Sequence, residues 1–121
     1  MNDPHPEAVK AQIARELTRV HEDSYGEVAY NVEVGLHEGF VAVIMELELS
    51  RAEVTLIDSG YSGSVKESRE TFQLAIADTF TAIVERATGR RVSSFGSRTV
   101  LDEDPPWSME IFRLARPPDD A

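Results

Sequence analysis

Apolar and polar positions follow a helical spacing early in the chain and then change to regular alternation. Within residues 7–21 the apolar positions recur at steps of three and four residues, which places them on one face of a helix. They are Val9, Ile13, Leu17 and Val20. Within residues 28–36 every second side chain is large and apolar, the period of a strand with one buried face. Gly26 lies between the two segments, so the pattern predicts a helix, a turn and a strand.

A hairpin is predicted next. His37, Glu38 and Gly39 have the length and the glycine of a three-residue hairpin loop. Residues 40–49 return as a second strand, and its first half is apolar at every position. A strand that is apolar on both faces is typical of an inner position covered on both sides. We therefore expect this strand inside the sheet.

Two copies of the capping-box signature predict where the next helices begin. Ser50 and Glu53 form the first, which predicts a short helix that ends near residue 58. Ser64 and Glu67 form the second, which predicts a long helix closed by a glycine past its last turn. The apolar stripe of the long helix consists of Val65, Phe72, Ile76, Phe80, Ile83 and Ala87. This stripe favours packing of the long helix against a sheet.

The last part of the chain predicts a second hairpin. Residues 91–101 are β-prone, with Gly96 as the expected place of a bulge. A turn-rich segment separates them from the last strand, residues 107–115. The predicted order is α-β-β-α-α-β-β, a single α+β domain with a four-stranded antiparallel sheet and the long helix packed on one face. Residues 1–6 and 116–121 are expected to be frayed tails.

Composition narrows the function classes. The 121 residues include no cysteine, which excludes disulfides, thiolate metal sites and cysteine nucleophiles. The formal net charge of -10 argues against nucleic acid as a partner, because phosphate binding needs a basic surface. No stretch approaches the ~20 apolar residues of a membrane span, and the N-terminus lacks the basic start and apolar run of a secretory signal. We therefore expect a cytoplasmic protein without a membrane span.

The charge is unevenly distributed along the chain. Residues 1–60 hold 12 acidic and 4 basic side chains, a net −8, which leaves −2 for residues 61–121. The second half contains the one basic concentration, made of Arg86, Arg90, Arg91 and Arg98. Two interpretations stay open: a solvated surface that keeps the protein soluble, or a basic strip that contacts an acidic partner.

Motifs for catalysis or metal binding are not found in the sequence. It contains no glycine-rich phosphate loop, and its three histidines lack ligand spacing. Ser62-Gly63-Ser64 precedes a helix, where free amides can hold an anion, but an ordinary cap explains it better. The carboxylates that could act in acid–base chemistry are Glu33, Glu46, Glu48 and Glu70, but the sequence shows neither the burial nor the neighbouring group that would shift their pKa values. We therefore predict no catalytic residue, no cofactor and no metal, which favours a non-enzymatic protein and leaves an enzyme open.

Arg69 is the strongest candidate for a functional side chain. It interrupts the apolar face of the long helix, and Gln73 lies one turn further on. Arg69 either pairs with a strand carboxylate such as Glu46, which is a structural role, or binds a small anion. The candidate contacts for a partner or an anion are Arg69, Gln73, Arg90, Arg91 and Arg98.

Three motifs follow one another in a characteristic order. They are Leu47-x-x-Ser50-x-x-Glu53-x-x-Leu56, Val65-x-x-x-Arg69-x-x-Phe72 and Thr88-Gly89-Arg90-x-Val92. Across residues 16–112 this arrangement resembles the MpsC-like family, formerly a domain of unknown function, although Ser50 stands where Thr is expected. The resemblance implies a soluble accessory component of a membrane system that generates membrane potential through cation-coupled, bicarbonate-related uptake. It also implies peripheral association with a membrane transport protein, and it defines no catalytic residues.

Two other interpretations remain. The order of elements is also similar to the tunnelling fold of pterin- and purine-handling enzymes, which form rings and bind planar ligands through a carboxylate. Glu46 or Glu70 would be that carboxylate in this chain. Alternatively the chain is a dimeric interaction domain whose sheet edge pairs with its copy, with Trp107 at the interface or in the core. We expect a homodimer.

Overall fold

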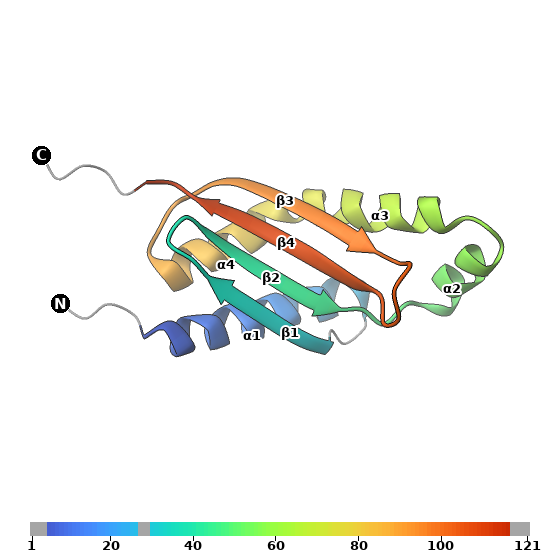
Figure 1. Ribbon diagram of the computed structural model, residues 1–121, viewed down its shortest axis with the longest axis horizontal. Coiled ribbons are helices and arrows are strands. Elements are labelled where there is room, and N and C mark those ends of the chain that lie inside the picture. Colours follow the sequence, from blue (N-terminus) through green and yellow to red (C-terminus); the bar gives the residue numbers. More distant parts are fainter. Residues whose placement is uncertain (1–4, 27–29, 117–121) are drawn as a thin grey trace, which may run out of the picture.

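The computed structural model describes residues 5–26 and 30–116. Its elements are α1 (Pro6–Tyr25), β1 (Tyr30–Leu36), β2 (Phe40–Glu46), α2 (Arg51–Asp58), α3 (Ser62–Ala75), α4 (Ala77–Thr88), β3 (Val92–Val100) and β4 (Trp107–Leu114). The strands form one antiparallel sheet in the order β1-β2-β4-β3 (Figure 1), which confirms the predicted α+β class. The tails predicted at 1–6 and 116–121 lie mostly outside the described residues, although Pro6 already belongs to α1.

Helix α1 extends past both ends of the predicted segment 7–21. At its start, Nδ1 of His5 accepts a hydrogen bond of 3.3 Å from the amide of Glu7. At its end, Gly26 adopts a φ of 69°, and its amide donates to the carbonyl of Glu22 at 2.8 Å. A residue without a Cβ adopts this left-handed conformation at little cost, so the glycine ends the helix as expected.

The strands confirm the two predicted hairpins, but they are shorter than the pattern predicts. β2 ends at Glu46 instead of residue 49. The first strand is predicted from residue 28, which lies outside the described residues, and β1 is described from Tyr30. β2 lies between β1 and β4, which confirms its predicted inner position.

Both outer strands of the sheet are bulged. In β1 the register shifts between Tyr30 and Glu33, and in β3 it shifts between Val92 and Ser94. Gly96, where the sequence predicts the bulge, pairs regularly with β4, so that prediction is wrong. A bulge twists an edge strand and hinders its pairing with another chain.

Helices α1, α3 and α4 lie on one side of the sheet (Figure 1), and the core forms between the two layers. The fully enclosed apolar residues include Ile13, Leu17, Val41, Val43, Met45, Phe80, Val84 and Phe112. Along β2 these alternate with residues that point away from the helices. In the part of the chain that the structure describes, no helix covers that other face. The prediction that β2 is covered on both sides is therefore wrong for the single chain.

The two predicted capping boxes have opposite outcomes. At the start of α2, the amide of Glu53 donates to Oγ of Ser50 at 3.1 Å, and the amide of Ser50 donates to Oε1 of Glu53 at 2.9 Å. Both bonds of the box are present, so this prediction is confirmed. At Ser64 the prediction is wrong, because α3 begins at Ser62 and its N-cap, Tyr61, makes no side-chain cap bond.

The predicted long helix is divided at Ile76, whose ψ of 13° separates α3 from α4. Hydrogen bonding continues through this point, from the Ile76 amide to the Phe72 carbonyl at 3.1 Å and from the Phe80 amide to the Ile76 carbonyl at 3.2 Å. The buried residues of α3 are Val65, Arg69 and Gln73. Phe72, predicted on the buried stripe, is only partly buried. Two polar side chains of α3 therefore take the inward positions.

Candidate functional site

A buried ion pair joins α2 to α3. Arg69 is 2% exposed, and its Nε and Nη2 atoms donate to Oε2 and Oε1 of Glu53, both at 2.7 Å. Burial raises the pKa of Glu53, but the hydrogen bonds from Arg69 and Ser50 outweigh it and lower the pKa below its ordinary value. Arg69 therefore forms an ion pair, as one of the two interpretations of the sequence expected, and Glu53 on α2 stands where a strand carboxylate such as Glu46 was suggested.

Two further polar side chains are enclosed beside this pair. His21, from the last turns of α1, is 0% exposed, and Gln73 is 1% exposed one turn after Arg69. Burial, together with the nearby charge of Arg69, lowers the pKa of His21 to about 4, while the charge of Glu53 opposes this shift. His21 is therefore neutral at pH 7. His21, Glu53, Arg69 and Gln73, which we call the buried polar cluster, come from α1 and from the consecutive helices α2 and α3.

Glu110 is a second buried polar group, and the sequence reasoning missed it. It lies on β4, is 0% exposed and accepts hydrogen bonds from Oγ of Ser97 at 3.0 Å and Oγ of Ser108 at 3.4 Å. Burial raises the pKa of Glu110 to about 7, and the two hydroxyl groups only partly oppose this. The available signal was alternation in β4, because Glu110 shares the face of Phe112 and Leu114.

The other carboxylates singled out from the sequence have separate roles. Oε2 of Glu70 accepts a hydrogen bond of 2.8 Å from the backbone amide of Thr99, which ties α3 to β3. Oε1 of Glu46 accepts one of 2.6 Å from Nδ2 of Asn31 on the neighbouring strand. Both proposed anchors of a tunnelling-fold ligand are thus bonded within the chain. Among the described residues, His and carboxylate side chains do not gather in groups of three that would suit a metal ion.

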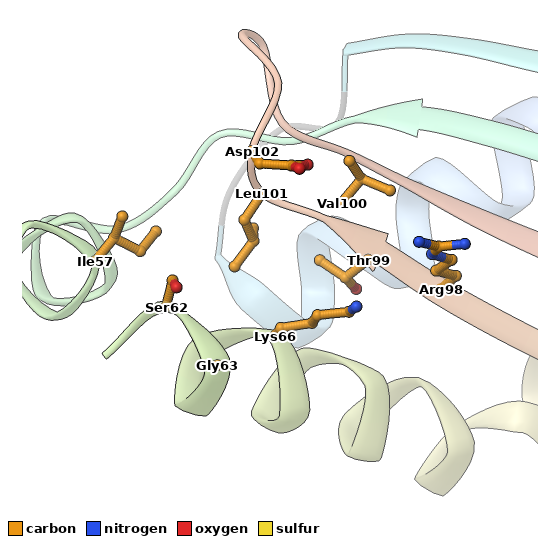
Figure 2. A pocket seen from close by; sticks show the side chains of 9 residues that line it. All are labelled: Ile57, Ser62, Gly63, Lys66, Arg98, Thr99, Val100, Leu101 and Asp102. Carbon is orange, nitrogen blue, oxygen red and sulfur yellow. The ribbon is translucent and has the colours of Figure 1, made fainter. Parts of the chain in front are cut away.

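A pocket of about 370 Å³ opens between the start of α3 and the end of β3 (Figure 2). Its lining residues are Ile57, Ser62, Gly63, Lys66, Arg98, Thr99, Val100, Leu101 and Asp102. The ammonium group of Lys66 lies below β3, whereas the guanidinium of Arg98 extends to the opposite side of that strand (Figure 2). The two cations therefore do not converge, and a carboxylate, Asp102, belongs to the same lining.

The predicted basic strip is not one surface. Arg86 contacts Oε1 of Glu16 at 2.9 Å. Arg90 donates to the carbonyl of Glu38 at 3.2 Å and to that of Ala115 at 2.9 Å, so it holds the first hairpin against the end of β4. Arg91 is exposed just before β3, and Arg98 is exposed near the end of that strand. Arg69 and Gln73 lie in the interior, so the structure does not bring the five predicted contacts together.

One side of the sheet is left uncovered by the described helices, and we call it the open face. It consists of strand residues that point away from the helices: Glu33, Gly35, Phe40, Ala42, Ile44, Glu46, Gly96, Arg98, Val100, Trp107, Met109, Ile111 and Arg113. Phe40 and Ile44 are 37% and 36% exposed. Trp107 belongs to this face and is partly buried, with Nε1 bonded to Oε1 of Glu103 at 3.2 Å.

Comparison with protein families gives one result. The family model described as "Na+-translocating membrane potential-generating system (MpsC)" matches residues 6–116, the whole of the described fold. The chain belongs to the MpsC family. Comparisons of this MpsC protein with curated proteins and with solved structures return no match.

The motifs of this MpsC protein converge on structural contacts. Glu53 belongs to the first motif and Arg69 to the second, and together they form the buried ion pair. Arg90, from the third motif, bonds two backbone carbonyls. None of the described helices is both long enough and apolar enough to cross a bilayer. The motif residues therefore explain how the MpsC chain folds, and its surface is where a partner has to be sought.

Proposed function

We propose that this MpsC protein is a non-enzymatic accessory or regulatory component of a Na+-translocating membrane potential-generating system linked to bicarbonate uptake. In this proposal it works in the cytoplasm and associates peripherally with the membrane-embedded part of the system. The observation that carries the proposal is the family match, which spans residues 6–116.

The placement of the polar groups supports a role without catalysis. His21 and Glu110 have the most strongly shifted pKa values, and both are 0% exposed. Glu110 lies between the sheet and the helices, and His21 lies among the helices. Groups enclosed in this way reach no substrate from solvent, which favours a part in folding and pH response. The open face, by contrast, offers apolar side chains at the surface, and such patches mark protein contacts.

Deletion of the coding sequence in its own cell tests the proposal. We expect a lower membrane potential, measured with a potentiometric dye, and a weaker response of that potential to added Na+ and bicarbonate. Expression of the wild-type chain should restore both, and the tagged chain should sediment with membranes that contain the transport system and stay in the supernatant without it. Unchanged potential and ion responses after deletion, together with no sedimentation, would contradict the proposed role.

A further inference from the structure

The side chains of the open face are arranged in rows that cross all four strands. One row runs from Glu33 on β1 through Ile44 and Met109 to Arg98 on β3, because these residues are paired neighbours in the sheet. The next row runs from Gly35 through Ala42 and Ile111 to Gly96. The first row therefore has an acid at one edge, a base at the other and apolar residues between them.

The single chain leaves this apolar surface in contact with water. Phe40 and Ile44 belong to β2, an inner strand that is apolar at every position from 40 to 45. Such a continuous apolar run is typical of a strand with a layer on each side. The helices supply one layer. Each apolar side chain left exposed on the other side would stabilise the protein if a second layer buried it. The pattern of β2 therefore indicates a second layer over the open face.

We propose that a second copy of this chain covers the open face, related to the first by a two-fold axis that runs nearly parallel to the strands. Sheets that pack face to face keep their strand directions within about 30° of each other. This axis sets β1 opposite the β3 of the partner subunit, and β2 opposite its β4. Glu33 then faces Arg98 of the partner subunit, and Ile44 faces Met109 of the partner subunit.

The second row fits the same axis. Ala42 faces Ile111 of the partner subunit, so a small residue receives a large one, and the glycines at the two edges face each other. Because a two-fold interface repeats every contact, each of these pairings occurs twice. The charges also favour this axis. A two-fold axis that crosses the strands sets β1 opposite the β1 of the partner subunit, and where it passes through the first row it places Glu33 over Glu33 of the partner subunit. The axis along the strands instead pairs Glu33 with Arg98 of the partner subunit.

This arrangement replaces the edge pairing that the sequence suggested for a dimer. The free edges belong to β1 and β3, and both carry bulges, at 30–33 and 92–94. Asn31, within the first bulge, has a φ of 47°, which is uncommon for a residue with a side chain. Bulged edges pair poorly with a second chain. The open face is therefore the better surface for a copy of the chain.

Charge reversal on the full-length protein tests the proposal. Sedimentation velocity over a range of concentrations gives the dimer dissociation constant of the wild type and of Glu33→Arg, Arg98→Glu and the double variant. Each single reversal should raise the dissociation constant about tenfold or more, because two symmetric contacts become repulsive. The double variant should return close to the wild-type value, because it restores opposite charges in swapped positions.

Matched controls separate this contact from a general effect of charge. Glu67→Arg on α3 and Arg51→Glu on α2 make the same changes at exposed helix positions and should leave the dissociation constant unchanged. Ile44→Asp should weaken the dimer while circular dichroism and the melting temperature of the monomer stay near the wild-type values. Three results would overturn the proposal. The wild type could be monomeric at every concentration, both single reversals could leave the dissociation constant unchanged, or the double variant could bind no more tightly than the single variants.

Discussion

Arg69 and Glu53 are 16 residues apart in the sequence and form two parallel hydrogen bonds of 2.7 Å. The same carboxylate accepts the amide of Ser50 at 2.9 Å, so one side chain closes the cap of α2 and binds the guanidinium from α3. Paired bonds to an arginine fix the relative orientation of both groups. This contact therefore sets the position of α2 on α3.

Replacement of Arg69 should destabilise the fold strongly. Arg69→Met substitutes an apolar side chain of similar length, which fills much of the same space, but it leaves the partly buried carboxylate of Glu53 without its guanidinium partner. Loss of one member of a buried pair costs about 3 kcal/mol or more in the free energy of unfolding. Urea unfolding followed by circular dichroism measures it, with Arg91→Met at an exposed position as the control. Equal losses for the two variants would show that the ion pair contributes nothing.

The two serines of the capping-box signatures should respond differently to the same substitution. Ser50→Ala removes the oxygen that accepts the Glu53 amide at 3.1 Å and should lower the free energy of unfolding by about 1 kcal/mol. Ser64→Ala should change it by less than about 0.5 kcal/mol, because this exposed residue lies inside α3 and caps nothing. Chemical unfolding of both variants checks this, and a larger loss at Ser64 would contradict the assignment.

The sequence predicts elements whose signals are local. Alternation in β1 and β4, the cap at Ser50 and the glycine at 26 depend on neighbouring residues, and each is found in the structure. The partner of Arg69 depends instead on how α2 docks on α3, which no local pattern encodes. The division at Ile76 carries no proline or glycine that would mark it. Tertiary packing decides such features.

The burial of Glu110 is a second feature that the local sequence pattern does not predict. Alternation places it on the face of Phe112, but a carboxylate on a half-buried strand is normally assigned to the solvent side. Only the packing of α3 and α4 over the sheet reveals that this face is enclosed. Tertiary packing also decides the state of the open face. The apolar run of β2 predicts a covering layer on each side, whereas the single chain supplies one.

Substitution of Glu110 should remove a pH dependence of stability. The pKa of Glu110 is raised from 4.5 to about 7 in the fold, so the folded state holds a proton that the unfolded state has released. Stability is therefore higher below pH 4.5 and falls as the pH rises toward 7. Glu110→Gln keeps the neutral form and should raise the free energy of unfolding at pH 8, by on the order of 3 kcal/mol.

Measurements of unfolding by urea between pH 4 and pH 8 check this. The control is Glu67→Gln, which makes the same change at an exposed position of α3 and should follow the wild-type curve. If Glu110→Gln is less stable than the wild type at pH 8, the carboxylate is required in its charged form, and the buried neutral state assigned to it is wrong.

His21 should produce the opposite pH dependence. Burial and the charge of Arg69 lower the pKa of His21 from 6.5 to about 4, so the unfolded state binds a proton that the folded state refuses. Stability is therefore lost as the pH falls from 6.5 toward 4, where the contribution of Glu110 works against it. The test is cleanest in the Glu110→Gln background, which removes the opposing slope, and above about pH 5, because Glu53, whose pKa is also lowered, adds an acid loss of its own below that pH. There, His21→Gln should abolish the loss between pH 6.5 and about pH 5, whereas His37→Gln, at an exposed position, should keep it. An acid slope that survives His21→Gln would mean that another group accepts the proton.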